Sequence, residues 1–163
     1  MNKRNIILIG MPGAGKSSVG VILAKVLGYE FIDTDLVIQH REKRLLREII
    51  ADEGNEGFLA IENEVNATLE ANKSVIAPGG SAIYGKEAME HFKEIGTIVY
   101  LKLSYEDLAK RLGNLKGRGV VLKEGQTLKD LYDERSKLYE QYAEITVDES
   151  GRDIQGTILA LRE

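Results

Sequence analysis

Short apolar runs alternate along the chain with longer stretches in which apolar positions recur at helical spacing. The runs predict strands over residues 5–9, 29–32, 74–77, 97–102 and 144–147. The stretches between them predict helices over residues 16–27, several helical turns up to residue 70, and helices over 86–94, 105–112, 127–142 and 152–162. Alternation of strands with helices is typical of a parallel sheet with helices on both faces. The pattern therefore predicts a five-stranded α/β domain.

Composition supports one domain over residues 1–163, because a chain of this length can bury a single hydrophobic core and no repeat or linker divides it. The net charge of −4 argues against a nucleic-acid-binding surface. The chain contains no cysteine, which excludes disulfides and thiol catalysis. Its first residues lead directly into a short strand, so we expect no signal peptide and no membrane span. These features predict a cytoplasmic enzyme without nucleic-acid or membrane partners, and we expect it to act as a monomer.

A glycine-rich loop joins the first predicted strand to the first predicted helix. Residues 10–17 read Gly-Met-Pro-Gly-Ala-Gly-Lys-Ser and match the pattern GxxxxGK[ST], whose backbone N–H groups surround a polyphosphate. Lys16 is expected to reach the β- and γ-phosphates of ATP, and the Ser17 hydroxyl to bind Mg²⁺. The expected nucleotide-binding residues of the loop are Gly13, Ala14, Gly15, Lys16, Ser17 and Ser18. A simple strand-to-helix turn is the alternative, but the strand–loop–helix setting favours phosphate binding.

Two carboxylates follow the second predicted strand. Asp33 and Asp35 are separated by one residue at the end of a strand, where a parallel sheet binds its ligands. Asp33 is a candidate Mg²⁺ ligand, directly or through water, and Asp35 is a candidate acceptor of a proton from a substrate hydroxyl. A cap on the following helix is the alternative role, chiefly for Asp33.

Three further stretches suggest parts of a binding site. Gly79 and Gly80 follow the strand over 74–77, and their backbone N–H groups either contact a small polar ligand or form an ordinary turn. The charged residues 41–57 predict a smaller substrate-side lobe, which we place at about residues 33–62. Residues 113–125 carry four glycines among basic residues and predict a mobile cationic lid.

Together these motifs resemble the shikimate kinase family, which belongs to the P-loop kinases similar to nucleoside monophosphate kinases. The resemblance covers nearly the whole chain. It is carried by the phosphate loop, by Phe31-Ile32-Asp33-Thr34-Asp35 with Ile38, by Phe58 with Glu62, by Gly79-Gly80-Ser81, and by Arg111, Arg118 and Arg135.

The resemblance implies a three-layer P-loop kinase with the strand order 2-3-1-4-5. It implies transfer of the γ-phosphoryl group of ATP, with Mg²⁺, to the 3-hydroxyl of shikimate in aromatic amino acid biosynthesis. Asp35 would orient the attacking hydroxyl and Asp33 would assist at Mg²⁺. Arg118 would neutralise the transferring group when the lid closes.

The remaining roles that the resemblance implies concern binding. Arg135 would pair with the substrate carboxylate, a geometry that suits a guanidinium. Gly79 and Gly80 would contact the substrate through their backbone, and Arg111 and Arg152 would flank the adenine.

The substrate side departs from the family pattern. Leu59 stands where the family has an arginine that shares the substrate carboxylate, and Pro78 stands where it has the first of three glycines. A basic residue of the run 41–47, such as Arg44 or Arg47, is a candidate replacement. Two other functions therefore remain open: a related kinase with a different small-molecule acceptor, and a nucleotide-binding protein that transfers no phosphate.

Overall fold

A computed structural model describes residues 5–113 and 125–149 of the chain. The strands are β1 (Asn5–Ile9), β2 (Glu30–Asp33), β3 (Ser74–Ala77), β4 (Gly96–Lys102) and β5 (Ile145–Asp148). All pair in parallel in one sheet of order β2-β3-β1-β4-β5. This arrangement confirms the predicted five-stranded sheet and its order, and each strand lies within one residue of its predicted bounds. The helix expected over residues 152–162 and nearly all of the expected lid lie outside the described residues.

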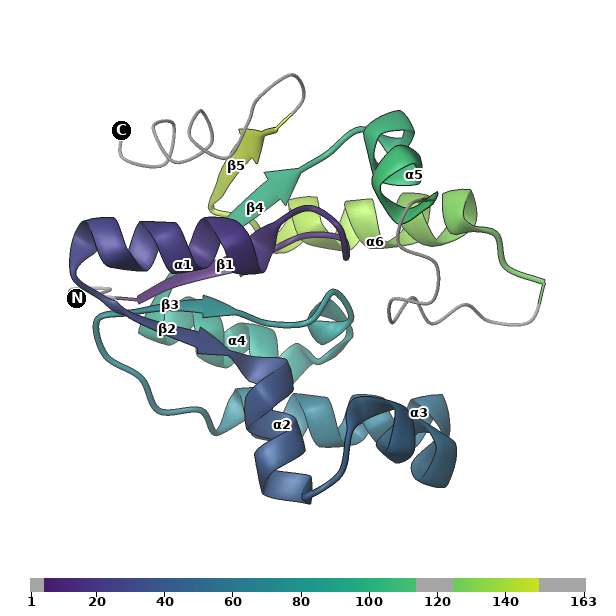
Figure 1. Ribbon diagram of the computed structural model, residues 1–163, viewed down its shortest axis with the longest axis horizontal. Coiled ribbons are helices and arrows are strands. Elements are labelled where there is room, and N and C mark those ends of the chain that lie inside the picture. Colours follow the sequence, from purple (N-terminus) through teal and green to yellow (C-terminus); the bar gives the residue numbers. More distant parts are fainter. Residues whose placement is uncertain (1–4, 114–124, 150–163) are drawn as a thin grey trace.

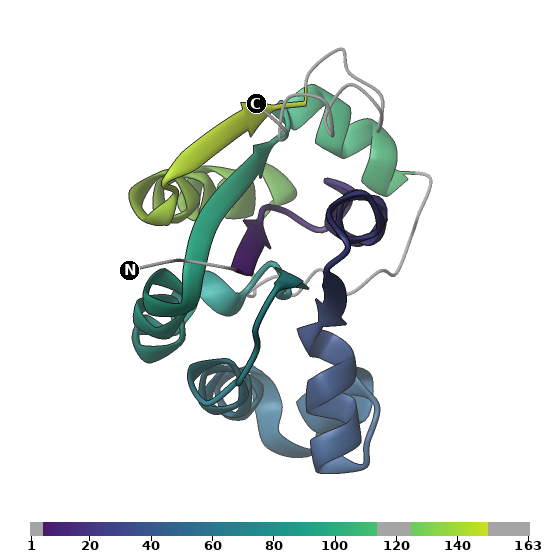
Figure 2. The ribbon, with the colours of Figure 1, turned by 90° about the vertical axis from the view of Figure 1, so that its left-hand side faces the viewer.

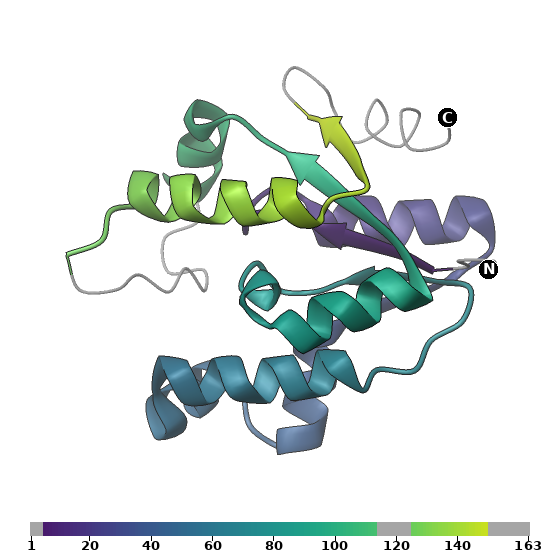
Figure 3. The ribbon, with the colours of Figure 1, turned by 180° about the vertical axis from the view of Figure 1, so that it is seen from behind.

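Helices cover both faces of this sheet. They are α1 (Lys16–Leu27), α2 (Thr34–Glu42), α3 (Leu46–Ala67), α4 (Lys86–Ile95), α5 (Tyr105–Gly113) and α6 (Leu128–Tyr142), with a short 3₁₀ helix η1 (Ala82–Tyr84). Figures 1 and 3, seen from opposite sides, show α1 on one face and α4 and α6 on the other. In the part of the chain that the structure describes, no helix is long and apolar enough to cross a membrane.

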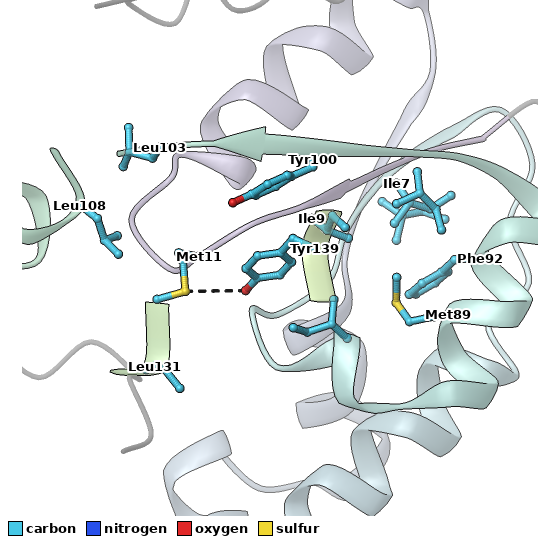
Figure 4. Close-up of a cluster of buried hydrophobic side chains, with 13 residues drawn as sticks. Ile7, Ile9, Met11, Met89, Phe92, Tyr100, Leu103, Leu108, Leu131 and Tyr139 are labelled. Carbon is cyan, nitrogen blue, oxygen red and sulfur yellow. Dashed lines mark hydrogen bonds between the residues drawn. The ribbon is translucent and has the colours of Figure 1, made fainter. Parts of the chain in front are cut away.

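The larger part of the core lies between the sheet and the helices α4 and α6. Its aromatic centre is Tyr139 of α6, whose ring stacks on that of Tyr100 with the centroids 5.1 Å apart (Figure 4). The Tyr139 hydroxyl donates a hydrogen bond to the carbonyl oxygen of Gly80 at 2.7 Å and lies 3.9 Å from the sulfur of Met11. Because Met11 belongs to the phosphate loop and Gly80 follows β3, this packing fixes both loops relative to α6.

The helices α2 and α3 form a separate small layer below the sheet in the view of Figure 2. They pack on each other through a separate apolar cluster of Ile38, Ile49, Phe58 and Val65. Within α3, Gly54 has φ 75° and ψ 175°, so the helix is kinked at this residue. The helical turns before and after Gly54 therefore do not form one continuous regular helix.

Candidate active site

A cavity of about 800 Å³ opens where the strands β1, β2 and β3 end. It brings together the phosphate loop, the acids after β2, the glycines after β3, one side of α3 and two arginines. The predicted site residues that line it are Gly13, Gly15, Lys16, Ser17, Ser18, Asp33, Asp35, Gly79, Gly80, Arg111 and Arg135. Ala14 is fully buried in the core behind the loop. Arg118 and Arg152 lie outside the described residues.

The phosphate loop has the backbone conformation that its glycines predict. Gly15 has φ 81°, a left-handed conformation that favours glycine, and stands at the N-terminus of α1. At Gly10, a β-carbon would lie 2.8 Å from the carbonyl oxygen of Leu101, so only glycine fits against β4. The helix α1 begins without a side-chain cap. The amide groups of its first turn are therefore available to a phosphate, which fits ATP.

Lys16 is held over this loop by backbone oxygens. Its ammonium group donates hydrogen bonds to the carbonyl oxygens of Gly10 at 2.8 Å and Met11 at 2.9 Å. Burial lowers the pKa of Lys16 to about 8, while the negative charge of Asp35 acts in the opposite direction. A polyphosphate in the loop would supply the negative charge that favours the protonated amine.

Asp33 caps the helix α2. Its Oδ1 accepts a hydrogen bond from the backbone N–H of Asp35 at 2.9 Å, so the capping alternative is correct for this residue. The cap uses one carboxylate oxygen and leaves the other. Asp33 and Ser17 line the same cavity, and Mg²⁺ in phosphate sites is commonly held by one or two such oxygen ligands together with phosphate oxygens. The residues present therefore fit a Mg²⁺ ion beside a bound polyphosphate.

Two acids with raised pKa values meet beside Gly79. Burial, with the nearby charge of Asp33, raises the pKa of Asp35 to about 6. Burial also raises the pKa of Glu62, which is 1% exposed, to about 7 and outweighs the hydrogen bond of 2.7 Å that its Oε1 accepts from Ser81. A β-carbon at Gly79 would lie 2.9 Å from Asp35 Oδ1 and 3.0 Å from Glu62 Oε2. A carboxylate such as Asp35, close to the neutral range, is suited to accept a proton.

Arg135 of α6 forms the opposite wall. It is 4% exposed, its Nε has no hydrogen-bond partner among the described residues, and its guanidinium lies 5.6 Å from the ring centroid of Tyr84. A β-carbon at Gly80 would lie 2.9 Å from one of its terminal nitrogens. Within the described residues no carboxylate forms an ion pair with it. A buried cation of this kind favours an anionic ligand.

Arg111 of α5 lies over the phosphate loop. One of its terminal nitrogens donates a hydrogen bond to the carbonyl oxygen of Gly13 at 3.0 Å. The structure thus places Arg111 beside the phosphate loop, and its contact with the adenine stays a prediction.

The helix α3 contributes several lining residues, of which the sequence assigned a role only to Arg47, as a candidate second cation. Leu46, Ile50 and Phe58 supply an apolar wall, and Arg47 and Glu62 add charges. The pairs 46/50 and 58/62 have helical spacing, which is the signal that could have identified a common face. Leu59 packs instead against the apolar cluster between α2 and α3 and does not line the cavity.

Comparisons with known proteins agree with this geometry. Residues 12–161 match the model of the shikimate kinase family. Shikimate kinase 2 of Yersinia enterocolitica is 34% identical over 154 residues, which cover 89% of this chain and 86% of that protein. A shikimate kinase from Acinetobacter baumannii, solved in complex with shikimate, has a TM-score of 0.85 at 32% identity and covers 98% of this chain and 90% of its own. The shikimate kinase of Aquifex aeolicus has a TM-score of 0.77 at 30% identity, with 97% and 93% covered.

Proposed function

Since the chain belongs to the shikimate kinase family, we propose that it transfers the γ-phosphoryl group of ATP to the 3-hydroxyl of shikimate. The observation that carries this proposal is one cavity that brings together Asp35, a phosphate loop with Lys16, and a buried arginine, Arg135, that lacks an ion-pair partner among the described residues. A hydroxy acid fits this arrangement, because its hydroxyl can reach the carboxylate while its own carboxylate meets the arginine.

On the nucleotide side, the loop residues bind and orient. Mg²⁺–ATP, when bound, supplies the phosphoryl group. The first-turn amides of α1 hold phosphate oxygens, and Lys16 neutralises negative charge on them. Ser17 and Asp33 would hold the metal ion. Arg111, fixed to the Gly13 carbonyl oxygen, closes this side of the cavity.

On the acceptor side, Asp35 orients the attacking hydroxyl and accepts its proton. Arg135 pairs with the substrate carboxylate in a geometry that a guanidinium makes bidentate. The backbone of Gly79 and Gly80 can approach the substrate closely because neither residue carries a side chain. Glu62 holds Ser81 in place behind these glycines.

Further parts of the proposal rest on the sequence. Arg118 neutralises the transferring group from a lid at about residues 113–125, and Arg152 flanks the adenine together with Arg111. The substrate-side lobe comprises about residues 33–62 of a single domain. The enzyme acts as a monomer in the cytoplasm.

A coupled assay of ADP release over a panel of hydroxy acids and polyols tests this function. Shikimate should give the highest kcat/KM of the panel, and the Lys16→Met variant should supply the background rate. A higher kcat/KM with another acceptor would favour the alternative that the protein is a related kinase with a different small-molecule acceptor. ATP hydrolysis that no acceptor increases would favour a nucleotide-binding protein without transfer.

A further inference from the structure

We propose that Arg47 of α3 binds the carboxylate of the acceptor together with Arg135, so that two arginines from different helices hold one anion. This inference rests on the proposed function and specifies how its acceptor site recognises charge. It assigns a substrate-binding role to a residue in the lobe that lies beside the sheet.

Arg47 stands at the cavity with its charge uncompensated by protein. It lines the same cavity as Arg135, between Leu46 and Ile50 on the apolar wall of α3. Within residues 5–113 and 125–149, no carboxylate forms an ion pair with it. Its side chain is exposed, and within the described residues no hydrogen bond or ion pair fixes its guanidinium.

The neighbouring arginine is occupied. Arg44 forms ion pairs with Glu42 at 3.0 Å and with Asp52 and Glu53 at 3.2 Å each, and it does not line the cavity. These three carboxylates hold Arg44 at the joint between α2 and α3. Of the two arginines that the sequence offered as replacements, the structure thus favours Arg47.

The charges on the acceptor side favour a second cation. Asp35 and Glu62 both line this cavity. The positive charge of Lys16 acts on Asp35, and that of Arg135 acts on Glu62. An incoming carboxylate would add a third negative charge. Arg47 would supply a third positive charge, so the acceptor anion meets Arg47 as well as Arg135.

Steady-state kinetics on shikimate test the role of Arg47. The Arg47→Gln variant should raise the KM for shikimate by about tenfold, since one charge-assisted hydrogen bond is lost. Its kcat and its KM for ATP should stay within about twofold, because Arg47 is assigned no contact with the nucleotide. Arg47→Lys, which keeps the charge without the planar fork, should give an intermediate KM.

A matched control comes from Arg41, an exposed arginine of α2 that pairs with Glu64 at 2.9 Å and does not line the cavity. Arg41→Gln removes the same charge from the same lobe and should leave the KM for shikimate unchanged. If Arg41→Gln raised this KM as much as Arg47→Gln, long-range attraction would explain the effect and the proposal would fail.

The methyl ester of shikimate identifies the group that Arg47 contacts. The ester lacks the negative charge, so its KM should be the same for the wild type and for Arg47→Gln. An equal rise in KM for shikimate and for its ester would assign Arg47 a structural role and overturn the inference. If the wild type phosphorylates shikimate and Arg47→Gln has the same KM for it, this inference would be overturned while the proposed function would stand. A wild type that does not phosphorylate shikimate would overturn the proposed function, and the inference with it.

Discussion

Replacement of Glu62 by glutamine should make the protein relatively more stable at alkaline pH. Burial raises the pKa of Glu62 from its ordinary value of 4.5 to about 7 in the folded chain. Between these values the folded state holds a proton that the unfolded state has released. The free energy of unfolding of the wild type therefore falls as the pH rises through this window. Glutamine does not titrate in this range, so the unfolding free energy of the variant does not decrease for this reason as the pH rises.

The size of the effect follows from the two pKa values. A difference of about 2.5 pH units, at about 1.4 kcal/mol per unit, corresponds to about 3 kcal/mol. Glutamine keeps an oxygen that can accept the hydrogen bond from Ser81, so the local structure should be preserved. Relative to the wild type, Glu62→Gln should thus gain about 3 kcal/mol in unfolding free energy between about pH 4.5 and about pH 8.

Urea denaturation at several pH values measures this difference. Glu56→Gln is the matched control, because Glu56 lies on the same helix and is exposed. Its unfolding free energy should follow that of the wild type within about 0.5 kcal/mol at every pH. Parallel curves for the wild type and Glu62→Gln would refute the claim that burial raises the pKa of Glu62.

Four further predictions concern activity. Lys16→Met should reduce phosphoryl transfer to below about a tenth of the wild-type rate while the fold, measured by circular dichroism, is retained; a higher rate would remove Lys16 from the mechanism. Asp35 has a pKa of about 6 and must be ionised to accept a proton, so kcat/KM should fall as the pH drops below about 6. Asp35→Asn should lower kcat at least about a hundredfold, and an unchanged kcat would contradict its assigned role. Gly79→Ala places a methyl group 2.9 Å from Asp35 Oδ1, so kcat/KM for the acceptor should fall about tenfold to a hundredfold with an unchanged KM for ATP; a normal kcat/KM would contradict the close approach.

Local patterns were sufficient to predict the sheet and the strand–loop–helix setting of the phosphate loop. The strand β1, the loop after it and α1 follow one another directly in the sequence. The GxxxxGK[ST] pattern of the loop requires a strand before it and a helix after it. Lys16 and Asp35 accordingly line one cavity as the sequence predicts. The double role of Asp33 remained open because a helix cap and a metal ligand require the same residue type.

The acceptor side depends on contacts between distant segments. Helical spacing groups the positions of α3 that share a face, but it does not show which face turns toward the sheet, because that depends on how the lobe packs. In the structure Leu59 packs in the cluster between α2 and α3, while Arg47 lines the cavity. The burial of Glu62 results from packing beside Ser81, 19 positions away in the chain. Such pairings arise only when the lobe folds onto the sheet.

Phosphorus NMR of the reaction product tests the central claim most directly. Wild-type protein incubated with ATP, Mg²⁺ and shikimate should produce ADP and a phosphate monoester in equal amounts, with the phosphorus coupled to the proton on carbon 3 of the ring. The Asp35→Asn variant under the same conditions should produce neither at a comparable rate. Release of inorganic phosphate in place of the monoester, or a monoester at another position, would contradict the account.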